Sequence, residues 1–564
     1  MPKHFIMHNY QELTFNTVLS DVVSRYANNK ALSYIDQEPI TYAQMGNKIK
    51  AATAFLEQLG IKPGDKVVIY SQNMPNWGII YFTLQCMGVV AVPVLPDFNS
   101  RELQNVLTHS EAKAIFISKN LEYKYTETKS SFINYVISID DFSINSGSDT
   151  LIKFDDNARS QKTYHTDENA LSILLYTSGT TGDSKGVMLS QKNVLLNAMQ
   201  ANSIQPILEH DRFLSILPLS HTYENTIGLI LPIIKGANVT YLQKPPTPSI
   251  LLPAMKSVKP VLMMTVPLII EKVFRNSVLP QLQKKAITKF LYKFRPTQKL
   301  LHRIAGKKLY ETFGGHLKFF GIGGAKLDPQ VEQFLRDAKF PYAIGYGLTE
   351  TAPLLAGAAP FKGRFQSIGP KVQQCEVIIH NPDAKTGEGE IWAKGENIML
   401  GYYKNEAKTK EVMTDDGWFK TGDLGVFDQD GYLSHKGRLK NMIVSSNGEN
   451  IYPEEIESLI NNFRHVAESI VVEQKGKLVA LVHFNREELE HRLQEMKSDL
   501  SSNMDKKLDE FSKKVDDSIE TLSAELQQYI NSKVNKFSKI QKVIIQSDPF
   551  QKTATLKIKR YLYA

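Results

Sequence analysis

The chain has 564 residues, of which 42% are hydrophobic and 22% charged, and its formal net charge is +8. This length exceeds what one compact core accommodates, so two or more domains are expected. The mild positive charge suits anionic ligands such as nucleotides, or a membrane surface. Because the basic residues look dispersed, the charge argues against a nucleic-acid partner.

The two cysteines, Cys86 and Cys375, lie far apart and in no metal-ligand spacing, which predicts reduced thiols. The first residues lack the apolar core of a signal peptide. No stretch approaches the roughly 20 apolar residues of a membrane-spanning helix. We therefore expect a cytoplasmic protein, with peripheral membrane contact and a homodimer left open.

The first half of the chain alternates short apolar runs with amphipathic stretches. A buried strand is expected at Lys66–Tyr70, a helix through Met87, and another strand at Gly88–Pro93. Strand, helix and strand at this spacing predict a parallel sheet with helices on its faces. The same rhythm recurs at Ala114–Ile117, Leu171–Leu175 and Val261–Met264.

The sequence pattern changes near residue 370. From there, short apolar strands are separated by Gly, Asp and Asn, which predicts an antiparallel β subdomain. We expect an α/β protein with a large domain at 1–437, made of two parallel-type α/β subdomains and this β subdomain. A small mobile α+β domain would occupy 438–564.

The small domain is expected to carry a helical insertion at 486–536. Apolar residues recur every three or four positions from Leu489 to Val534, which is a sustained helical stripe. One interpretation is a break at Ser501–Asn503 and a hairpin packed on the small domain. The other is one long helix that contacts a second copy or a membrane.

A Gly/Thr/Ser-rich loop, Thr177-Ser-Gly-Thr-Thr-Gly-Asp-Ser-Lys185, follows the apolar strand at Leu171. Glycines let backbone amides approach phosphate oxygens, hydroxyls add donors, and Lys185 supplies a positive charge. A P-loop needs Gly-Lys-Ser/Thr after four free positions. Here Lys185 follows Ser184 and precedes Gly186, so the chain does not read as a P-loop NTPase.

Seven segments in order resemble the adenylate-forming superfamily of acyl-CoA synthetases, luciferases and peptide-synthetase adenylation domains. They are Tyr176–Gly186, Leu217–Glu224, Gly323–Ala325, Tyr346–Glu350, Thr421–Asp423, Gly437–Lys440 and Thr555–Arg560. Together they span some 380 residues, and weaker similarity covers nearly the whole chain.

The resemblance implies a reaction in which a carboxylate attacks the α-phosphorus of ATP and pyrophosphate leaves. Glu350 and Thr177 would hold Mg²⁺, Lys557 would bridge the acid and the α-phosphate, and Thr349 and His221 would position the reactants. ATP would contact Thr177, Ser178, Gly179, Thr180, Thr181, Gly182, Lys185, Gly324, Ala325, Tyr346, Gly347, Asp423, Arg438 and Lys440.

Coenzyme A is the expected acceptor, because only four residues follow the lysine motif and no fused carrier domain is present. Lys440 would be the hinge for domain rotation, and the thiol would enter along Ser446–Pro453. Leu217–Glu224 and Thr553–Arg560 look most like long-chain fatty acyl-CoA synthetases. Acids of roughly twelve to eighteen carbons are therefore expected, in a pocket lined by Met263–Ile270 and Ile227–Ile234.

Three other functions stay open on the sequence. One is a ligase that loads a separate acyl carrier protein. Another is an aryl or medium-chain acid–CoA ligase. The third is a non-catalytic nucleotide sensor, whose signature would be loss of Glu350 or Lys557; both are present.

Overall fold

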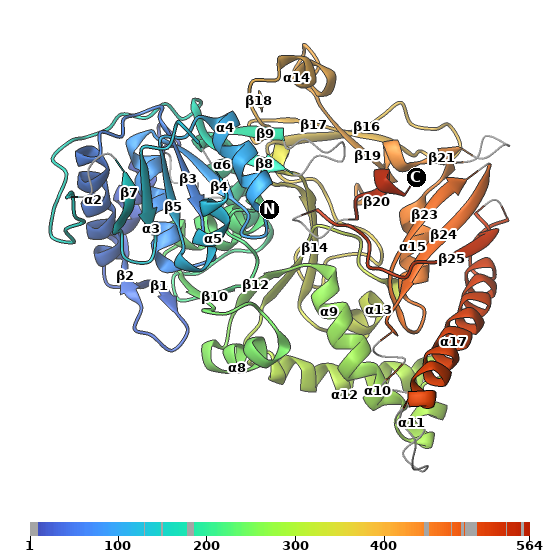
Figure 1. The fold of residues 1–564 in the computed structure, drawn as a ribbon. Coiled ribbons are helices and arrows are strands. Elements are labelled where there is room, and N and C mark those ends of the chain that lie inside the picture. The colour runs from blue at the N-terminus through green and yellow to red at the C-terminus, as the bar shows by residue number, and fades with distance from the viewer. Residues whose placement is uncertain are drawn as a thin grey trace.

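The structure, a computed structural model, describes residues 10–128, 130–147, 151–177, 185–444, 450–474, 476–486, 490, 505–536, 538–553 and 558–563. Figure 1 shows two large sheets in the first two thirds of the chain and a smaller group of strands and helices at the C-terminal end. The predicted α/β architecture, with a large N-terminal and a smaller C-terminal domain, is confirmed.

The first large sheet has the strand order β18-β9-β8-β4-β3-β5-β6-β7. Its parallel core is β8, β4, β3, β5 and β6, and β9 forms an antiparallel hairpin with β8. The strands are β3 (Lys66–Tyr70), β4 (Val90–Val94), β5 (Ala114–Ile117), β6 (Tyr135–Ser138), β7 (Ile144–Gly147), β8 (Leu171–Thr177), β9 (Lys185–Ser190) and β18 (Gly401–Tyr402).

Capping residues, proline and glycine determine where helices α2 and α3 begin and end. Thr41 and Gln44 form a capping box at the start of α2 (Tyr42–Gln58), and Pro75 opens α3 (Pro75–Met87). Gly88, at φ +67°, ends α3 in a left-handed conformation that glycine adopts without strain. The others are α1 (Phe15–Arg25), α4 (Ser100–Ser110), η1 (Lys119–Leu121), α5 (Glu122–Thr126) and α6 (Gln191–Ile204).

The second large sheet has the order β15-β14-β13-β12-β10-β11-β1-β2, with only the two edge strands antiparallel to their neighbours. Its strands are β1 (Lys30–Tyr34), β2 (Ile40–Thr41), β10 (Arg212–Ser215), β11 (Asn238–Tyr241), β12 (Leu262–Thr265), β13 (Phe319–Ile322), β14 (Tyr342–Gly347) and β15 (Leu354–Gly357). The helices are η2 (Tyr223–Ile230), α7 (Leu231–Ile234), α8 (Pro248–Val258), α9 (Pro267–Val273), η3 (Phe274–Val278), α10 (Leu279–Gln283), α11 (Ala286–Leu291), α12 (Arg295–Thr312), α13 (Pro329–Asp337) and η4 (Thr349–Thr351).

An antiparallel sheet of order β16-β17-β19-β20 follows, as the Gly- and Asp-punctuated sequence predicts. Its strands are β16 (Cys375–His380), β17 (Gly389–Gly395), β19 (Phe419–Phe427) and β20 (Leu433–Arg438). Between β18 and β19 lies α14 (Glu406–Val412), and η5 (Leu439–Asn441) follows β20. The register of β19 and β20 places Asp423 opposite Arg438, which matters for the site below.

The C-terminal part contains the pair β21 (Ile443–Val444) and β22 (Asn450–Ile451), and a sheet of β23 (Val466–Gln474), β24 (Lys477–Phe484) and β25 (Lys542–Ile545). Its helices are α15 (Pro453–Asn461), α17 (Asp505–Asn531) and η6 (Arg560–Leu562). Among the described residues, no helix combines the length and the apolar character that crossing a bilayer requires.

The described part of the apolar stripe belongs to the core of this small domain. Val515, Ile519, Leu522, Leu526 and Ile530 of α17 are buried and pack with residues of α15 and β24. This packing agrees with the first interpretation of the stripe, in which it lies on the small domain. The proposed break at Ser501–Asn503 lies outside the described residues.

Candidate active site

The ends of several strands converge between the large sheets and the small antiparallel sheet. Thr177 and Lys185 end β8 and begin β9, and they face each other across that hairpin. The predicted phosphate ligands between them, Ser178, Gly179, Thr180, Thr181 and Gly182, lie outside the described residues. The hairpin therefore fixes both ends of the loop at the edge of the sheet.

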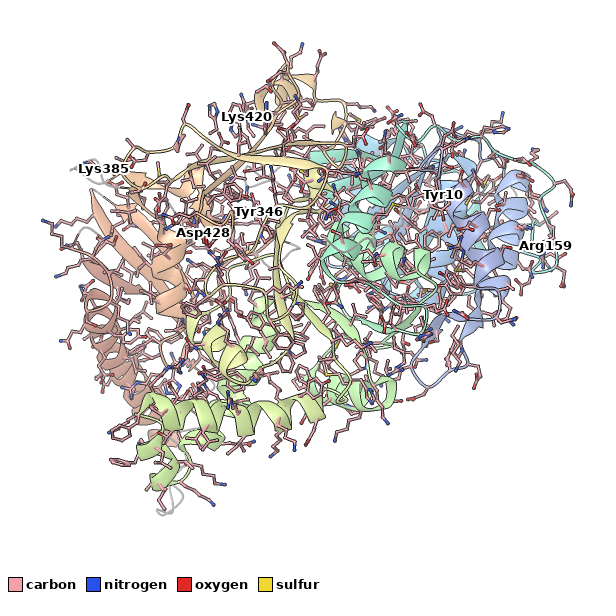
Figure 2. The ribbon with its side chains drawn as sticks, turned by 180° about the vertical axis from the view of Figure 1, so that it is seen from behind. Tyr10, Arg159, Tyr346, Lys385, Lys420 and Asp428 are labelled. Atoms are coloured by element: carbon pink, nitrogen blue, oxygen red, sulfur yellow. The ribbon has the colours of Figure 1, made fainter. Side chains whose placement is uncertain are left out.

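Tyr346 and Gly347 end β14, and Gly324 and Ala325 follow the neighbouring parallel strand β13. Gly324 and Ala325 are exposed, so they form an open rim beside Tyr346. A side chain at Gly347 would meet the carbonyl oxygen of Pro353 at 1.7 Å, so only glycine fits there. Ligands of open α/β sheets bind at such carboxyl ends of strands. Figure 2 labels Tyr346 near the centre of the molecule.

Asp423 is buried at the centre of a polar network. The Tyr346 hydroxyl donates to its Oδ2 at 2.8 Å, and the Arg438 Nε lies 2.8 Å from its Oδ1. His435 Nε2 lies 3.5 Å from the same Oδ1, and its ring is 5.7 Å from that of Tyr346. Burial raises the pKa of Asp423, but the contacts with His435, Arg438 and Tyr346 outweigh it and hold the pKa below its usual value. Asp423 is therefore a carboxylate at neutral pH.

Glu350 lies in η4 directly after β14, next to Thr349, another of the predicted residues. The Tyr402 hydroxyl donates to its Oε1 at 2.9 Å, and the Met399 amide donates to its backbone carbonyl. Among the described residues, no hydrogen bond to its Oε2 is recorded. A fixed carboxylate with one open oxygen is a suitable ligand for a hard cation such as Mg²⁺.

Four cations gather on the same side of the site. The Lys185 Nζ lies 5.1 Å from the Tyr402 ring centre, and burial together with the charge of Lys408 lowers its pKa. Desolvation and the charges of Arg438, Lys185 and Lys408 likewise lower the pKa of Lys440. Cations that repel one another are stabilised when an anion joins them. The cluster thus suits a polyanionic ligand such as a triphosphate.

His221 lies in the loop after β10, directly before η2. Its Nδ1 accepts a hydrogen bond of 3.2 Å from the Tyr223 amide. That bond leaves the proton of a neutral ring on Nε2. Lys557 lies outside the described residues.

The small domain rests against this site. The Tyr452 hydroxyl of the small domain donates to Glu388 Oε2 of the large domain at 2.6 Å. Lys326, one residue beyond Ala325, lies 3.2 Å from Glu455 of α15. The segment from β20 to α15 is therefore tied to the large domain beside the predicted nucleotide ligands.

An apolar cavity with a volume of about 50 Å³ lies beneath the site. Its wall includes Gly345, the residue before Tyr346, so the cavity reaches the nucleotide-side residues of β14. Ile227, Leu231 and Met264, which belong to the two segments expected to line an acyl pocket, lie in its wall. Other lining residues, such as Ala201, Ile204, Phe213, Leu262, Ile344 and Leu354, come from elements that the sequence did not connect with a pocket. Ligand sites are commonly lined in this way, mostly by apolar side chains.

Three side chains of the site were not predicted: Tyr402, His435 and Lys408. None of them belongs to a recognised motif. Tyr402 and His435 are placed at the site by strand pairing, and Lys408 by α14. Tyr402 is brought beside Lys185 because β18 pairs with β9. Residue spacing along the chain carries no signal for such contacts.

The arrangement is that of a nucleotide-binding α/β enzyme with a buried acidic residue, a cation cluster and an adjoining apolar cavity. The chain belongs to the AMP-binding enzyme family, whose model matches residues 19–403. It is 28% identical over 483 residues to a long-chain-fatty-acid–CoA ligase of Mycobacterium bovis, covering 80% of this chain and 78% of that one.

A fatty acyl-CoA synthetase A of Dictyostelium discoideum is 28% identical over 463 residues, which cover 75% of this chain and 68% of that one. Among solved structures, the o-succinylbenzoate–CoA synthetase of Bacillus subtilis with ATP and a magnesium ion has a TM-score of 0.73. It is 22% identical and covers 96% of this chain and 98% of that one. This likeness shows the shared fold.

Glu224 should make stability depend on pH. It is fully buried, its Oε2 has no partner among the described residues, and burial raises its pKa to about 8, against a smaller opposing hydrogen bond from Ser215. A raised carboxyl pKa favours the folded state at low pH, and that contribution is lost as pH rises from about 4.5 towards 8. Glu224→Gln should therefore gain stability relative to the wild type over this range, by up to a few kcal/mol at about 1.4 kcal/mol per pKa unit.

Thermal unfolding at pH 5, 7 and 8.5 checks this prediction. Glu332 is a matched buried control, because it accepts hydrogen bonds from Tyr342 and Gln366. Glu332→Gln should destabilise the protein at every pH. A Tm difference between Glu224→Gln and the wild type that stays constant with pH would contradict the assignment.

Proposed function

We propose that this protein activates a long-chain fatty acid with ATP and then transfers the acyl group to coenzyme A. A carboxylate oxygen attacks the α-phosphorus, the bond to pyrophosphate breaks, and an acyl-adenylate forms. The coenzyme A thiolate then attacks the acyl carbonyl carbon and AMP leaves. The observation that carries the proposal is the contact of Tyr346 with Asp423, next to an apolar cavity whose wall includes Gly345, the residue before Tyr346.

The site residues receive roles that fit their contacts. Asp423 would accept the ribose hydroxyls, and Tyr346 would flank the adenine together with Gly324 and Ala325. Thr177, Lys185 and the loop to Ser184 would hold the outer phosphates, together with Lys440 and Arg438. These cations neutralise charge as two anions meet, which is the main task of such a catalyst.

Glu350 would hold Mg²⁺ through its open oxygen, with Thr177 as a second oxygen ligand. The bound cation would offset phosphate charge. Lys557 would bridge the attacking carboxylate and the α-phosphate, and His221 would position the acid near the cavity mouth. Coenzyme A would approach along Ser446–Pro453, with Lys440 as the hinge of domain rotation.

The long-chain preference is supported by the name of the Mycobacterium bovis relative and by the apolar lining of the cavity. Each methylene removed from water contributes about 0.8 kcal/mol, so a cavity lined by aliphatic side chains favours long chains over short ones. Pyrophosphate release measured across acids of two to twenty carbons should peak between twelve and eighteen carbons. A peak at acetate or at an aromatic acid would contradict the proposed preference for long-chain fatty acids.

The acceptor is tested in the same assay. With palmitate and ATP present, coenzyme A should give palmitoyl-CoA, whereas a holo-acyl carrier protein should give no thioester. If the thioester forms only on the carrier protein, coenzyme A is not the acceptor, but the proposed adenylation step still holds.

Filling the cavity should shorten the preferred acid. Ala201 of α6 lines it with a methyl group, so Ala201→Phe places a ring in the space of several methylenes. We expect kcat/KM for palmitate to fall by about ten- to a hundredfold, because lost burial costs roughly 1–3 kcal/mol. Octanoate should lose less than about threefold. Ala201→Ser is the size-matched control, and equal losses for both acids with Ala201→Phe would argue against the cavity as the acyl site.

A further inference from the structure

The outer surface of α11 and α12 exposes large apolar side chains. Ile287, Phe290, Phe294, Leu300 and Ile304 are between 51% and 73% exposed. The rings of Phe290 and Phe294 contact only at their edges, 5.2 Å between centres, at the surface. In Figures 1 and 2, α12 forms the lower edge of the molecule, away from the large sheets. Apolar residues gathered in this way mark an interaction surface.

The same surface concentrates the positive charge of the chain. Residues 284–308 contain nine lysines and arginines, all exposed, and no aspartate or glutamate. The rest of the chain has 58 basic residues against 59 acidic ones, since the totals are 67 and 59. The basic residues are dispersed through most of the chain, and this segment is an exception to that pattern. The net charge of +8 is due to this segment.

The inner face of α12 is fixed by contacts with Asp337 and Ala338. Arg295 NH1 lies 2.7 Å from Asp337 Oδ2, and His302 Nδ1 lies 2.8 Å from the same oxygen. Gly306 packs so closely on Ala338 that an added Cβ would meet its methyl group at 2.3 Å. Apart from Arg295, none of the nine basic residues has an acidic partner among the described residues. The inner face of α12 is thus fixed while its charged outer face is unpaired.

We propose that α11 and α12 dock this protein on a membrane surface that contains anionic lipids. Along α12, Leu300 and Ile304 are one turn apart, and Lys299 and Arg303 lie directly beside them. Aliphatic and aromatic tips flanked by lysine and arginine enter the headgroup region of a bilayer, where anionic lipids supply the missing counter-charge. The proposal does not depend on which acid the enzyme activates.

Co-sedimentation of the full chain with vesicles tests the proposal. Vesicles of phosphatidylcholine with about one third phosphatidylglycerol should bind the protein, and pure phosphatidylcholine should bind at least about tenfold less. Binding should weaken as salt rises, because screening shortens the range of the lipid charge. Equal binding to both vesicle types would overturn the proposal.

Two variants locate the surface. Lys299→Glu with Arg303→Glu, and separately Phe290→Ser with Phe294→Ser, should each weaken binding to anionic vesicles by about tenfold or more. Lys371→Glu with Lys385→Glu is the charge-matched control, and Figure 2 labels Lys385 on the opposite side of the molecule from α12. Phe361→Ser, at a position 72% exposed, is the aromatic control. Both controls should bind as the wild type does.

Other occupants of the surface predict different results. If Phe290→Ser with Phe294→Ser turns a dimer into a monomer in sedimentation without vesicles, the surface binds a second copy and the proposal fails. It fails also if the charge-reversed variant loses binding to a single-stranded oligonucleotide but keeps its binding to vesicles. Unchanged Tm values for both variants would show that the exposed substitutions leave the fold intact.

Discussion

Replacing Glu350 by glutamine is expected to slow adenylate formation by about 10²- to 10³-fold, the usual cost of losing one charge-stabilising group. Glutamine keeps the size of the side chain and the hydrogen bond from Tyr402. It removes the negative charge that would hold Mg²⁺ against the phosphates. The loss should therefore appear in the rate and in a higher Mg²⁺ requirement, and protein stability should change little.

Palmitate-dependent exchange of labelled pyrophosphate into ATP, measured across a Mg²⁺ series, checks this prediction. Tyr402→Phe is the matched control, because it leaves the carboxylate in place and removes only its hydrogen-bond donor. We expect Tyr402→Phe to lose about ten- to a hundredfold at most, since one hydrogen bond to a charged group contributes roughly 1.5–3 kcal/mol, and to keep the wild-type Mg²⁺ dependence. Wild-type Mg²⁺ dependence in Glu350→Gln would show that this carboxylate does not bind the metal.

The strands were predictable where burial is continuous. Lys66–Tyr70 is observed with the predicted bounds, and Val261–Met264 is shifted by one residue in β12. Local apolar runs determine such strands because each is buried on both faces. The sheet that each strand joins was not predictable. β1 precedes β3 in the chain yet pairs with β11 of the other sheet, some 200 residues away.

In the candidate site too, single residues were predictable from the sequence but their contacts were not. Asp423 and Arg438 were each found through a motif, but their contact follows from the register of β19 and β20. His435 lies on β20, the strand of Arg438, and it belongs to none of the seven motif segments. The proposed membrane surface on α11 and α12 shows the same limit. The longer stripe from Leu489 to Val534 is the stronger periodic signal, yet its described part from Val515 to Ile530 is buried.

Substitution of Asp423 by asparagine is expected to raise the KM for ATP and lower kcat/KM by about 10²-fold or more. Asp423 stays ionised at neutral pH because its neighbours hold its pKa low. Asparagine would leave the guanidinium of Arg438, whose side chain is 38% exposed, without its counter-ion. Solvent screens part of this loss, which therefore stays below the roughly 3–5 kcal/mol of a fully buried pair. Some destabilisation should therefore accompany the kinetic loss, and a fall in Tm reports it.

The kinetic role is separated from the structural one by the sugar of the nucleotide. A carboxylate that accepts ribose hydroxyls rejects an analogue lacking one of them, because its own lone pairs are then left unpaired. The wild type should therefore prefer ATP to 2′-deoxy-ATP strongly, and Asp423→Asn should lose most of that preference. His435→Gln, which alters the network but keeps the carboxylate, should retain it. If Asp423→Asn discriminates between the two nucleotides as the wild type does, Asp423 supports the fold and does not bind the ribose.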